Sequence, residues 1–344
     1  MKLGRLGVWY STDKLNGSQL ADLMQVVEKN GYSAFWHPES RGYEAMSLGS
    51  YLLSKSEKLV IGSSIANIYA RDAYTARRGM ISMNELYGGR YILGLGVSHI
   101  PMVEGLRGHK YDKPLGAMSA YLDAVYKDAP SDSPVVVAAL GPKMLELSAK
   151  KAMGAVPYNV TPKHTAQAAR TLGSNKILAV EQKVTIETDP AKARALGRKE
   201  LSRYMVLPNY RNNWLRLGFT EADLANGGSD RFIDAMCLWG DANTIKKGLR
   251  AHFDAGATHV CLQPVHADGD LEPRALAVAA APGGLLPAVR RCAATARSGR
   301  CGPSSGAFWS QTILSWLSCS GELGIELVRY RNLGLLAIGG LSDC

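Results

Sequence analysis

The strongest constraint on the fold is a regular alternation of short apolar segments with longer amphipathic ones. Eight segments read as strands, at residues 4–10, 33–37, 59–65, 90–99, 134–139, 155–158, 176–187 and 258–265. Their hydrophobic and polar residues do not alternate strictly, which is typical of parallel strands buried on both faces. Eight strand-then-helix units predict a (β/α)8 barrel, in which ligands bind at the carboxyl ends of the strands.

An open, doubly wound sheet is the alternative architecture. Such a sheet is expected to carry a dinucleotide-binding fingerprint after its first strand. The first segment contains Gly4 and Gly7, but these glycines do not form a G-x-G-x-x-G pattern. The chain of 344 residues also suits one barrel of about 250 residues with additions. The barrel is therefore favoured.

Charge and hydropathy narrow the class of protein. The net charge of +10 comes from basic residues scattered along helical faces, which fits a solvated surface or a rim that attracts an anionic ligand. No nucleic-acid-binding motif is present, so nucleic acid is not expected as a partner. The chain has neither an apolar run of roughly 18 residues nor a signal-peptide pattern at its start. We expect a cytoplasmic protein that does not contact membranes.

Helix starts are predicted from side chains that accept hydrogen bonds from backbone N–H groups. The predicted N-caps are Ser18, Asp72, Thr161, Asp189 and Asp241.

Two stretches break the alternation. Residues 207–230 form a long connection before a predicted helix at 231–239, and long connections are often functional, so we expect this one to lie over the ligand pocket. Residues 281–344 lack any strand–helix pattern and contain four of the six cysteines. We predict a barrel domain at 1–280 and an irregular C-terminal tail at 281–344, which is either a non-native extension or a genuine short addition. No cysteine pair has C-x-x-C spacing, so neither a metal site nor a disulfide framework is expected.

Polar and ionisable residues gather just past the predicted strands, whereas the strand interiors are apolar. These strand-end residues are Trp36, His37, Glu39, Ser63 to Asn67, Ser98, His99, Leu140, Gly141, Lys143, Tyr158, Asn159, Gln263 and His266. Since the carboxyl ends of barrel strands meet at one face, this distribution predicts a ligand pocket there.

The fourth segment, residues 90–99, carries the most informative pattern. It turns from bulky apolar residues to Gly94 and Gly96, which allow a close approach to the backbone, and it ends on Ser98 and His99. A histidine exchanges protons near neutral pH, which makes His99 a candidate for proton transfer. His37 is a candidate for stacking on a ring or hydrogen bonding to it. The alternative for both is a histidine whose ring is satisfied by a backbone carbonyl.

The Leu140–Gly141–Pro142–Lys143 turn joins a strand to a helix. Its free N–H groups and the positive end of the helix dipole favour a phosphate group. A tight turn that simply requires glycine is the equally open alternative.

Three motifs together resemble a known family. They are Gly-Arg-Tyr-Ile-Leu-Gly-Leu-Gly-Val-Ser-His at 89–99, Pro-Val-Val-Val-Ala-Ala-Leu-Gly-Pro-Lys-Met at 134–144 and Trp-Gly-Asp at 239–241. In this order and spacing the chain resembles the bacterial luciferase-like superfamily. Within it, the chain looks like the actinobacterial oxidoreductases that use the deazaflavin coenzyme F420. The resemblance covers about residues 3–275.

The resemblance implies a deazaflavin ring at the carboxyl face of the barrel. Leu140 and Gly141 match the turn that holds the cofactor phosphate, and Ser63-Ser64 matches the position of a non-prolyl cis peptide behind the ring. His99 falls where relatives that oxidise sugar phosphates place an acidic glutamate. His37 falls near an Asp-His pair of other members, but the residue before it is Trp36, so that pair is incomplete.

The combined prediction of the site has two parts. The expected catalytic residues are His99, His37 and Glu39. The expected cofactor contacts are Trp36, His37, Ser63, Ser64, Ile65, Ala66, Gly94, Gly96, Ser98, Leu140, Gly141 and Tyr158.

The function implied is hydride transfer between coenzyme F420 and a small organic substrate, with His99 giving or taking the accompanying proton. One alternative is an FMN-dependent monooxygenase of the same superfamily. Another is a barrel that binds a cofactor or metabolite without turnover, which the incomplete pair at His37 keeps open. No metal is expected. A homodimer is possible, because barrels of this family often pair.

Overall fold

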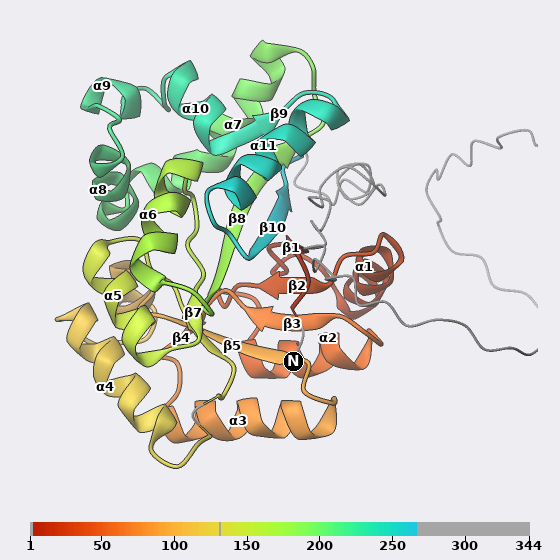
Figure 1. Cartoon of the computed structure of the whole chain (residues 1–344), viewed down its shortest axis with the longest axis vertical. Helices are drawn as coiled ribbons and strands as arrows, with labels where there is room; N and C mark the ends of the chain where they lie inside the picture. The colour runs from red at the N-terminus through yellow and green to blue at the C-terminus, as the bar shows by residue number, and fades with distance from the viewer. Residues whose placement is uncertain (1–2, 131, 267–344) are drawn as a thin grey trace, which may run out of the picture. The chain divides into compact units, whose positions relative to one another are not determined.

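The computed structural model describes residues 3–130 and 132–266 (Figure 1). In this part of the chain, eight parallel strands close into a barrel and helices connect successive strands. The predicted (β/α)8 class is therefore confirmed. The prediction of a tail at 281–344, with its four cysteines, lies outside the described residues.

The eight barrel strands fall within the eight segments expected from the sequence, except that β7 starts one residue before the expected segment at 155–158. In chain order they are β1 (Leu6–Trp9), β2 (Ala34–His37), β3 (Val60–Ser63), β5 (Tyr91–Gly96), β6 (Val135–Val137), β7 (Gly154–Ala155), β8 (Ile177–Thr185) and β10 (His259–Pro264). Two further short strands are β4 (Ala66–Asn67), which pairs with β5, and β9 (Cys237–Trp239), which pairs with β8.

The barrel closes through its last strand. Strand β10 pairs with β1, with Leu6 opposite Val260, and also with β8, with Leu262 opposite Gln182. Strand β8 is long enough to pair with β7 near its start, at Ile177 opposite Gly154, and with β9 near its end. This length lets β8 carry side chains from the base of the barrel up to its mouth.

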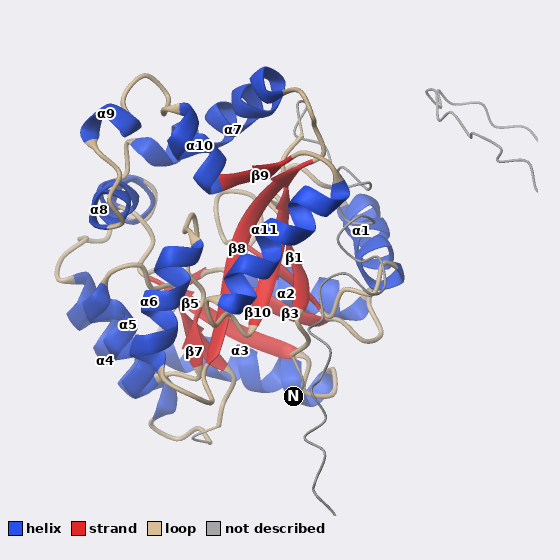
Figure 2. Cartoon of the chain, turned by 45° about the horizontal axis from the view of Figure 1, so that its top comes forward, coloured by secondary structure: helices blue, strands red, loops and turns tan. Residues whose placement is uncertain are grey.

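Helices cover the outside of the barrel (Figure 2). They are α1 (Gly17–Lys29), α2 (Ala45–Ser54), α3 (Ala73–Leu86), the π-helix η1 (Pro101–Gly105), α4 (Pro114–Tyr126), α5 (Pro142–Lys151), α6 (Pro162–Leu172), α7 (Pro190–Met205), α8 (Pro208–Arg216), α9 (Glu221–Leu224), α10 (Asp230–Met236) and α11 (Ala242–Asp254). None of the described helices has the length and apolar character to span a bilayer.

Four of the predicted N-caps are confirmed, because each side chain accepts from a backbone N–H of the first turn of its helix. These residues are Asp72, Thr161, Asp189 and Asp241. The prediction of Ser18 is wrong: Asn16 caps α1, and its side chain accepts from Gln19 N in a reciprocal capping box.

Side chains on the strands divide into two layers. Trp9, Ala34 and Trp36 belong to a buried cluster inside the barrel, together with residues of β6 and β10. Val8 and Phe35, their neighbours along the chain, belong to the cluster between the strands and the helices. This alternation follows from the pleat of a strand, which sends successive side chains to opposite faces.

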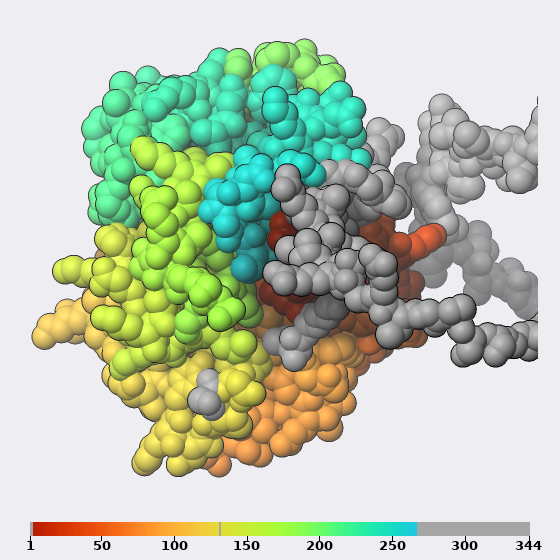
Figure 3. Space-filling model, in the orientation of Figure 1, coloured from red at the N-terminus to blue at the C-terminus, as the bar shows by residue number. Residues whose placement is uncertain are grey.

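The stretch at 207–230 is mostly helical, since it contains α8 and α9. The predicted helix at 231–239 ends at Met236, and its last three residues form β9 instead. Helices α7 to α10 group together at one end of the described structure (Figures 1 and 3). Their shared cluster is built around Trp214 and Phe232, whose rings meet edge to face at 4.8 Å.

Candidate functional site

Aromatic side chains meet at the carboxyl end of the barrel. Tyr158, just after β7, lies between Trp9 at 4.9 Å and Tyr204 of α7 at 5.5 Å, measured between ring centres. Tyr210 of α8 contacts Tyr158 at 6.2 Å and Tyr204 at 5.2 Å. Helices α7 and α8 thus contribute aromatic side chains directly to the barrel mouth.

His99 faces this aromatic group. Its ring centre lies 5.7 Å from that of Tyr210, and the side chain is neither fully buried nor exposed. Ser98 precedes it with a left-handed backbone (φ 57°), which turns the chain out of β5. Burial lowers the pKa of His99 below its usual range, so its imidazole is neutral at pH 7 and suited to accept a proton.

The Leu140–Gly141 turn is open and lies beside a cation. A Cβ built on Gly141 would meet nothing within 4 Å except Arg216 Nη2, at 3.7 Å. Gly141 is the N-cap of α5 but has no side chain to cap it, and Pro142 offers no N–H. Arg216, at the end of α8, therefore adds positive charge at a helix end that is already positive.

The surroundings of this turn also hold buried polar groups. Arg216 Nη2 donates to Asn213 Oδ1 at 3.3 Å, and Asn213 Nδ2 is buried without a hydrogen-bond partner among the described residues. His164 Nε2 lies 2.9 Å from the carbonyl oxygen of Leu140, to which it can only donate. An uncapped helix end, a guanidinium and a spare amide donor together suit a phosphate-bearing ligand.

A buried polar network occupies the top of the barrel interior. Lys183 of β8 is fully buried, and its Nζ donates to Asn159 Oδ1 at 2.6 Å, Glu181 Oε1 at 3.1 Å and Gln263 Oε1 at 3.4 Å. The same ammonium lies 4.2 Å from the centre of the Tyr158 ring. Burial is the largest single influence and would lower the pKa of Lys183, but the surrounding acidic groups, Glu181 first and Glu200 among them, together raise the pKa, so the ammonium stays charged.

The network opens onto a cavity. Tyr158 Oη donates to Gln263 Oε1 at 2.7 Å, and Gln263 Nε2 donates to Glu200 Oε1 at 3.0 Å. Gln263 and Glu200 line a cavity of about 450 Å³ between the ends of β1 and β10 and helix α7. Its other lining residues are Tyr10, Ser11, Asp13, Lys14, Leu15, Gln19, Leu196, Lys199, Arg203, Pro264, Val265 and His266.

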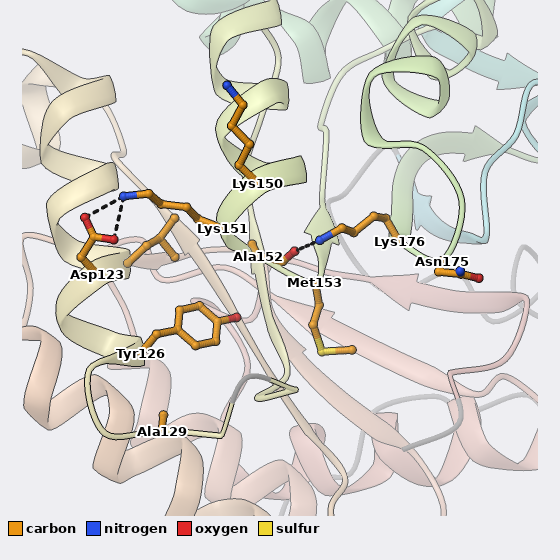
Figure 4. Close-up of a pocket in the computed structure, with 10 residues that line it drawn as sticks. Asp123, Tyr126, Ala129, Lys150, Lys151, Ala152, Met153, Asn175 and Lys176 are labelled. Carbon is orange, nitrogen blue, oxygen red and sulfur yellow. Dashed lines mark hydrogen bonds and ion pairs between the residues drawn. The ribbon is translucent and has the colours of Figure 1, made fainter.

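A second cavity, of about 420 Å³, lies at the other end of the strands (Figure 4). Met153 and Lys176 line it, and each immediately precedes a barrel strand. Lys176 donates to the carbonyl oxygen of Ala152, and Lys151 pairs with Asp123. Because ligands of this fold bind at the carboxyl ends, the mouth remains the candidate site.

The structure shows a close approach at Gly94 and Gly96 from a neighbouring segment, and their predicted contact with a ligand ring stays a prediction. A Cβ on Gly94 would lie 1.9 Å from the carbonyl oxygen of Ser63, and one on Gly96 would lie 2.4 Å from the Ile65 side chain. These glycines let the neighbouring β3 segment approach β5. Ser63 serves the same contact, because its hydroxyl donates to Gly94 O and accepts from Gly94 N, both at 2.9 Å.

Trp36 and His37 do not reach the mouth as predicted. Trp36 is fully buried inside the barrel, where its Nε1 donates to His259 Nε2 at 3.1 Å. His37 is also fully buried, and strand alternation places it on the helix-facing side with Phe35. Burial lowers the pKa of His37 to about 4, and neither ring nitrogen has a hydrogen-bond partner among the described residues.

Glu39 has a structural role in this geometry. Its carboxylate accepts from the backbone N–H of Asn67 at 2.7 Å and of Ala45 at 3.3 Å, and it pairs with Arg71. These bonds tie the end of β2 to β4 and to the start of α2. A carboxylate engaged in this way is poorly placed for the predicted catalysis.

The segment after β3 departs from its prediction by one residue. The cis peptide joins Ser64 to Ile65, not Ser63 to Ser64. The Ser64 carbonyl oxygen accepts from Trp9 Nε1 at 3.2 Å, and Ile65 packs against the interior cluster. Ala66 is fully buried in the outer core, so its predicted contact with a ligand is wrong.

Sequence reasoning missed three residues of the site: Lys183, Glu181 and Arg216. The first two sit in the segment Val-Glu-Gln-Lys-Val at 180–184, where charged residues interrupt a buried strand, and that interruption was the available signal. Arg216 had no signal, since it is one basic residue on a connecting helix.

A comparison with known families finds a match over the first part of the chain. Residues 1–127 match the model of the luciferase-like monooxygenase family. This part of the chain is similar to that family. A putative coenzyme F420-dependent oxidoreductase of Mycobacterium tuberculosis is 32% identical to it over 139 residues, which cover 40% of this chain and 39% of that protein. The 5,10-methylenetetrahydromethanopterin reductase of Methanolobus tindarius is 23% identical over 292 residues, covering 70% and 89% of the two chains.

Solved structures share the fold of this chain. An F420-dependent secondary alcohol dehydrogenase, solved with an F420–acetone adduct, aligns with a TM-score of 0.64 at 14% identity, covering 81% of this chain and 98% of the other. A type II Baeyer–Villiger monooxygenase of Pseudomonas putida, solved with FMN, aligns with a TM-score of 0.63 at 12% identity, covering 82% and 98%. At these identities the likeness establishes the barrel fold, and both cofactor types occur among the neighbours.

Proposed function

We propose that the chain is an oxidoreductase that transfers a hydride between coenzyme F420 and a small organic substrate. The observation that carries this proposal is the carboxyl end of the barrel, where Arg216 of α8 lies beside the open Gly141 turn and Tyr210 of the same helix contacts the half-buried His99. The match to a putative coenzyme F420-dependent oxidoreductase favours the deazaflavin over FMN.

The residues at the mouth fit a phosphate-bearing cofactor. Gly141 leaves its backbone open, and Arg216 lies beside it as a charged donor. Both coenzyme F420 and FMN carry a phosphate, so this geometry supports either one. When bound, the cofactor supplies the hydride chemistry, and the protein supplies binding and orientation.

The chain's own groups would divide the remaining work. Tyr158 and Tyr210, whose rings are inclined at 61°, give aromatic side chains for a ligand to pack against. His99 Nδ1 or Nε2, neutral at pH 7, accepts the proton that leaves a substrate hydroxyl as its carbon gives up hydride. The neutral imidazole is the form of His99 that substrate oxidation requires.

Equilibrium binding of both cofactors tests the proposal. We expect micromolar or tighter binding of coenzyme F420, followed by fluorescence, and weaker binding of FMN. Binding of FMN alone would instead support the monooxygenase. Binding of coenzyme F420 with no oxidation or reduction by any alcohol or carbonyl compound in stopped-flow assays would support a non-catalytic binding barrel.

A further inference from the structure

We propose that Lys183 and Glu181 form an oriented charge pair, positive toward the barrel mouth, that favours the anionic, reduced form of the bound redox ring. This inference rests on the proposed function and names an electrostatic role for residues within that site. It concerns two side chains that sit behind Tyr158 and Gln263 in the barrel interior.

Stability does not account for the pair. Taking two charges out of water is costly, and a buried ion pair is often replaceable by apolar residues without loss of stability. Lys183 is 1% exposed and Glu181 is 4% exposed. The interior beneath them is apolar, with Ala179 and Val156 in the same cluster. The strand therefore changes from apolar to charged at the level where the mouth begins.

The orientation of the pair follows from the strand. Both residues point into the barrel from β8, with Lys183 two residues closer to the carboxyl end than Glu181. Two residues advance a strand by roughly 6–7 Å, so the ammonium is the end that faces the mouth. Asn159 binds both partners, because its side-chain oxygen accepts from Lys183 and its N–H donates to Glu181 Oε2 at 3.1 Å.

The ammonium is also close to groups that form the mouth. Its distance to the Tyr158 ring centre is 4.2 Å and to the Tyr204 ring centre 5.4 Å. Gln263 lies opposite Lys183 in the β8–β10 register and lines the cavity at the same end. A ligand that binds over Tyr158 and Gln263 would have the Lys183 ammonium directly behind these two side chains.

The chemistry that responds to such a charge is ring reduction. A neutral isoalloxazine-type ring that accepts a hydride becomes an anion, because the hydride brings one negative charge. A fixed charge near the ring is one of the ways in which proteins tune bound cofactors. In a site shielded from water the interaction persists over several ångströms.

The test compares affinities for the oxidised and the reduced cofactor, measured anaerobically with whichever of coenzyme F420 and FMN the wild-type protein binds. The uncharged double variant Glu181→Gln/Lys183→Met should lower the preference for the reduced form by roughly tenfold. Glu181→Gln alone keeps the ammonium and should raise that preference. The exposed Lys192→Met on α7 is the matched control and should leave the preference unchanged.

Opposite effects of the two variants, with a melting temperature of the double variant at or above that of the wild type, support the charge role. An unchanged preference in the double variant overturns it, and a large loss of stability with unchanged preference assigns the pair to folding instead. Those results leave the proposed function standing. Failure of the wild-type protein to bind either cofactor removes both proposals.

Discussion

Single side chains at the mouth and in the barrel interior have environments that fix their protonation. His99 is neutral at pH 7 because burial lowers its pKa. Burial keeps His259 neutral, and its two partners fix the tautomer: its Nδ1 donates to Gly4 O at 2.6 Å, and its Nε2 accepts from Trp36 Nε1. Protonation of His99 would therefore affect the candidate site, whereas protonation of His259 would affect the stability of the barrel interior.

His99→Ala should reduce turnover at least roughly tenfold, the low end for loss of a proton-transfer group. Cofactor affinity should change little, because the proposed phosphate site is at Gly141. Steady-state kinetics and a binding titration on the same preparation separate these effects, with His99→Gln as a variant of similar size. In the wild type, kcat/KM should rise with pH through a pKa below 6.5. Unchanged turnover in both variants would exclude His99 from the reaction.

Acid should destabilise the fold through its buried neutral histidines. Burial lowers the pKa of His259 to about 4, below its unfolded value near 6.5. The unfolded chain therefore binds the proton first, and stability present above pH 6.5 is lost as the pH falls toward 4. The contribution of His259 should shrink by roughly 1–2 kcal/mol between pH 7 and pH 5.

Urea denaturation at both pH values measures this effect. A His259→Asn variant is expected to be less stable at pH 7 yet to lose less stability on going to pH 5. An equal loss in variant and wild type would show that His259 does not titrate as described.

At the scale of elements, the carboxyl ends of β5 and β6 have different tasks. The glycines of β5 bring two backbone segments together, whereas the glycine after β6 leaves a helix end open. The first arrangement is a requirement of packing and the second is an opening for a ligand. Substitutions at the two places should therefore affect different measurements.

Gly94→Ala should destabilise the barrel, because its Cβ would lie 1.9 Å from the Ser63 carbonyl oxygen. We expect a loss of about 2–4 kcal/mol, comparable with severe overpacking of a core. Gly116→Ala in α4 is the control. Its Cβ would meet only Lys113 Cβ at 3.9 Å, and helix propensity predicts a gain of roughly 0.5–1 kcal/mol. Equal unfolding free energies for Gly94→Ala and the wild type would refute the close strand contact.

Arg216→Gln should weaken binding of the phosphate-bearing cofactor by about tenfold and reduce the dependence of binding on salt, since one charge-assisted contact is lost. Arg211→Gln on the same helix is the comparison, because Arg211 pairs with Glu221 away from the turn. Titrations at low and high ionic strength provide both quantities. Parallel behaviour of the two variants would place the phosphate elsewhere.

Local sequence patterns predicted the strands and caps, but not the contacts made between distant parts of the chain. The strands were predictable because buried parallel strands are contiguous apolar runs, and N-caps such as Asp72 and Asp241 because capping is local. Gly94 and Gly96 signalled a close approach, but a glycine does not specify whether a ligand or a neighbouring strand approaches. Lys183 and Arg216 come together with the mouth only through barrel closure and the packing of α8, which no local pattern encodes.

At the scale of the whole molecule, the closed ring lies entirely within the described residues. Its last strand, β10, ends at Pro264, and the ring needs no later strand to close. Removing the residues after about position 282 should leave a soluble chain with the same circular dichroism and cofactor affinity. Aggregation of the shortened chain, or loss of its cooperative unfolding, would show that the tail contributes to folding. The full-length chain, unfolded under the same conditions, is the reference.

Closure through β10 also has a consequence for synthesis on the ribosome. Strand β1 emerges first but finds its second neighbour only when β10, some 250 residues later in the chain, has left the exit tunnel. Until then the nascent sheet exposes the unpaired edges of β1 and β8, which are the kind of surface that other chains can join. Because β10 is the last strand to be synthesised, each newly made chain can close its barrel only in one late step.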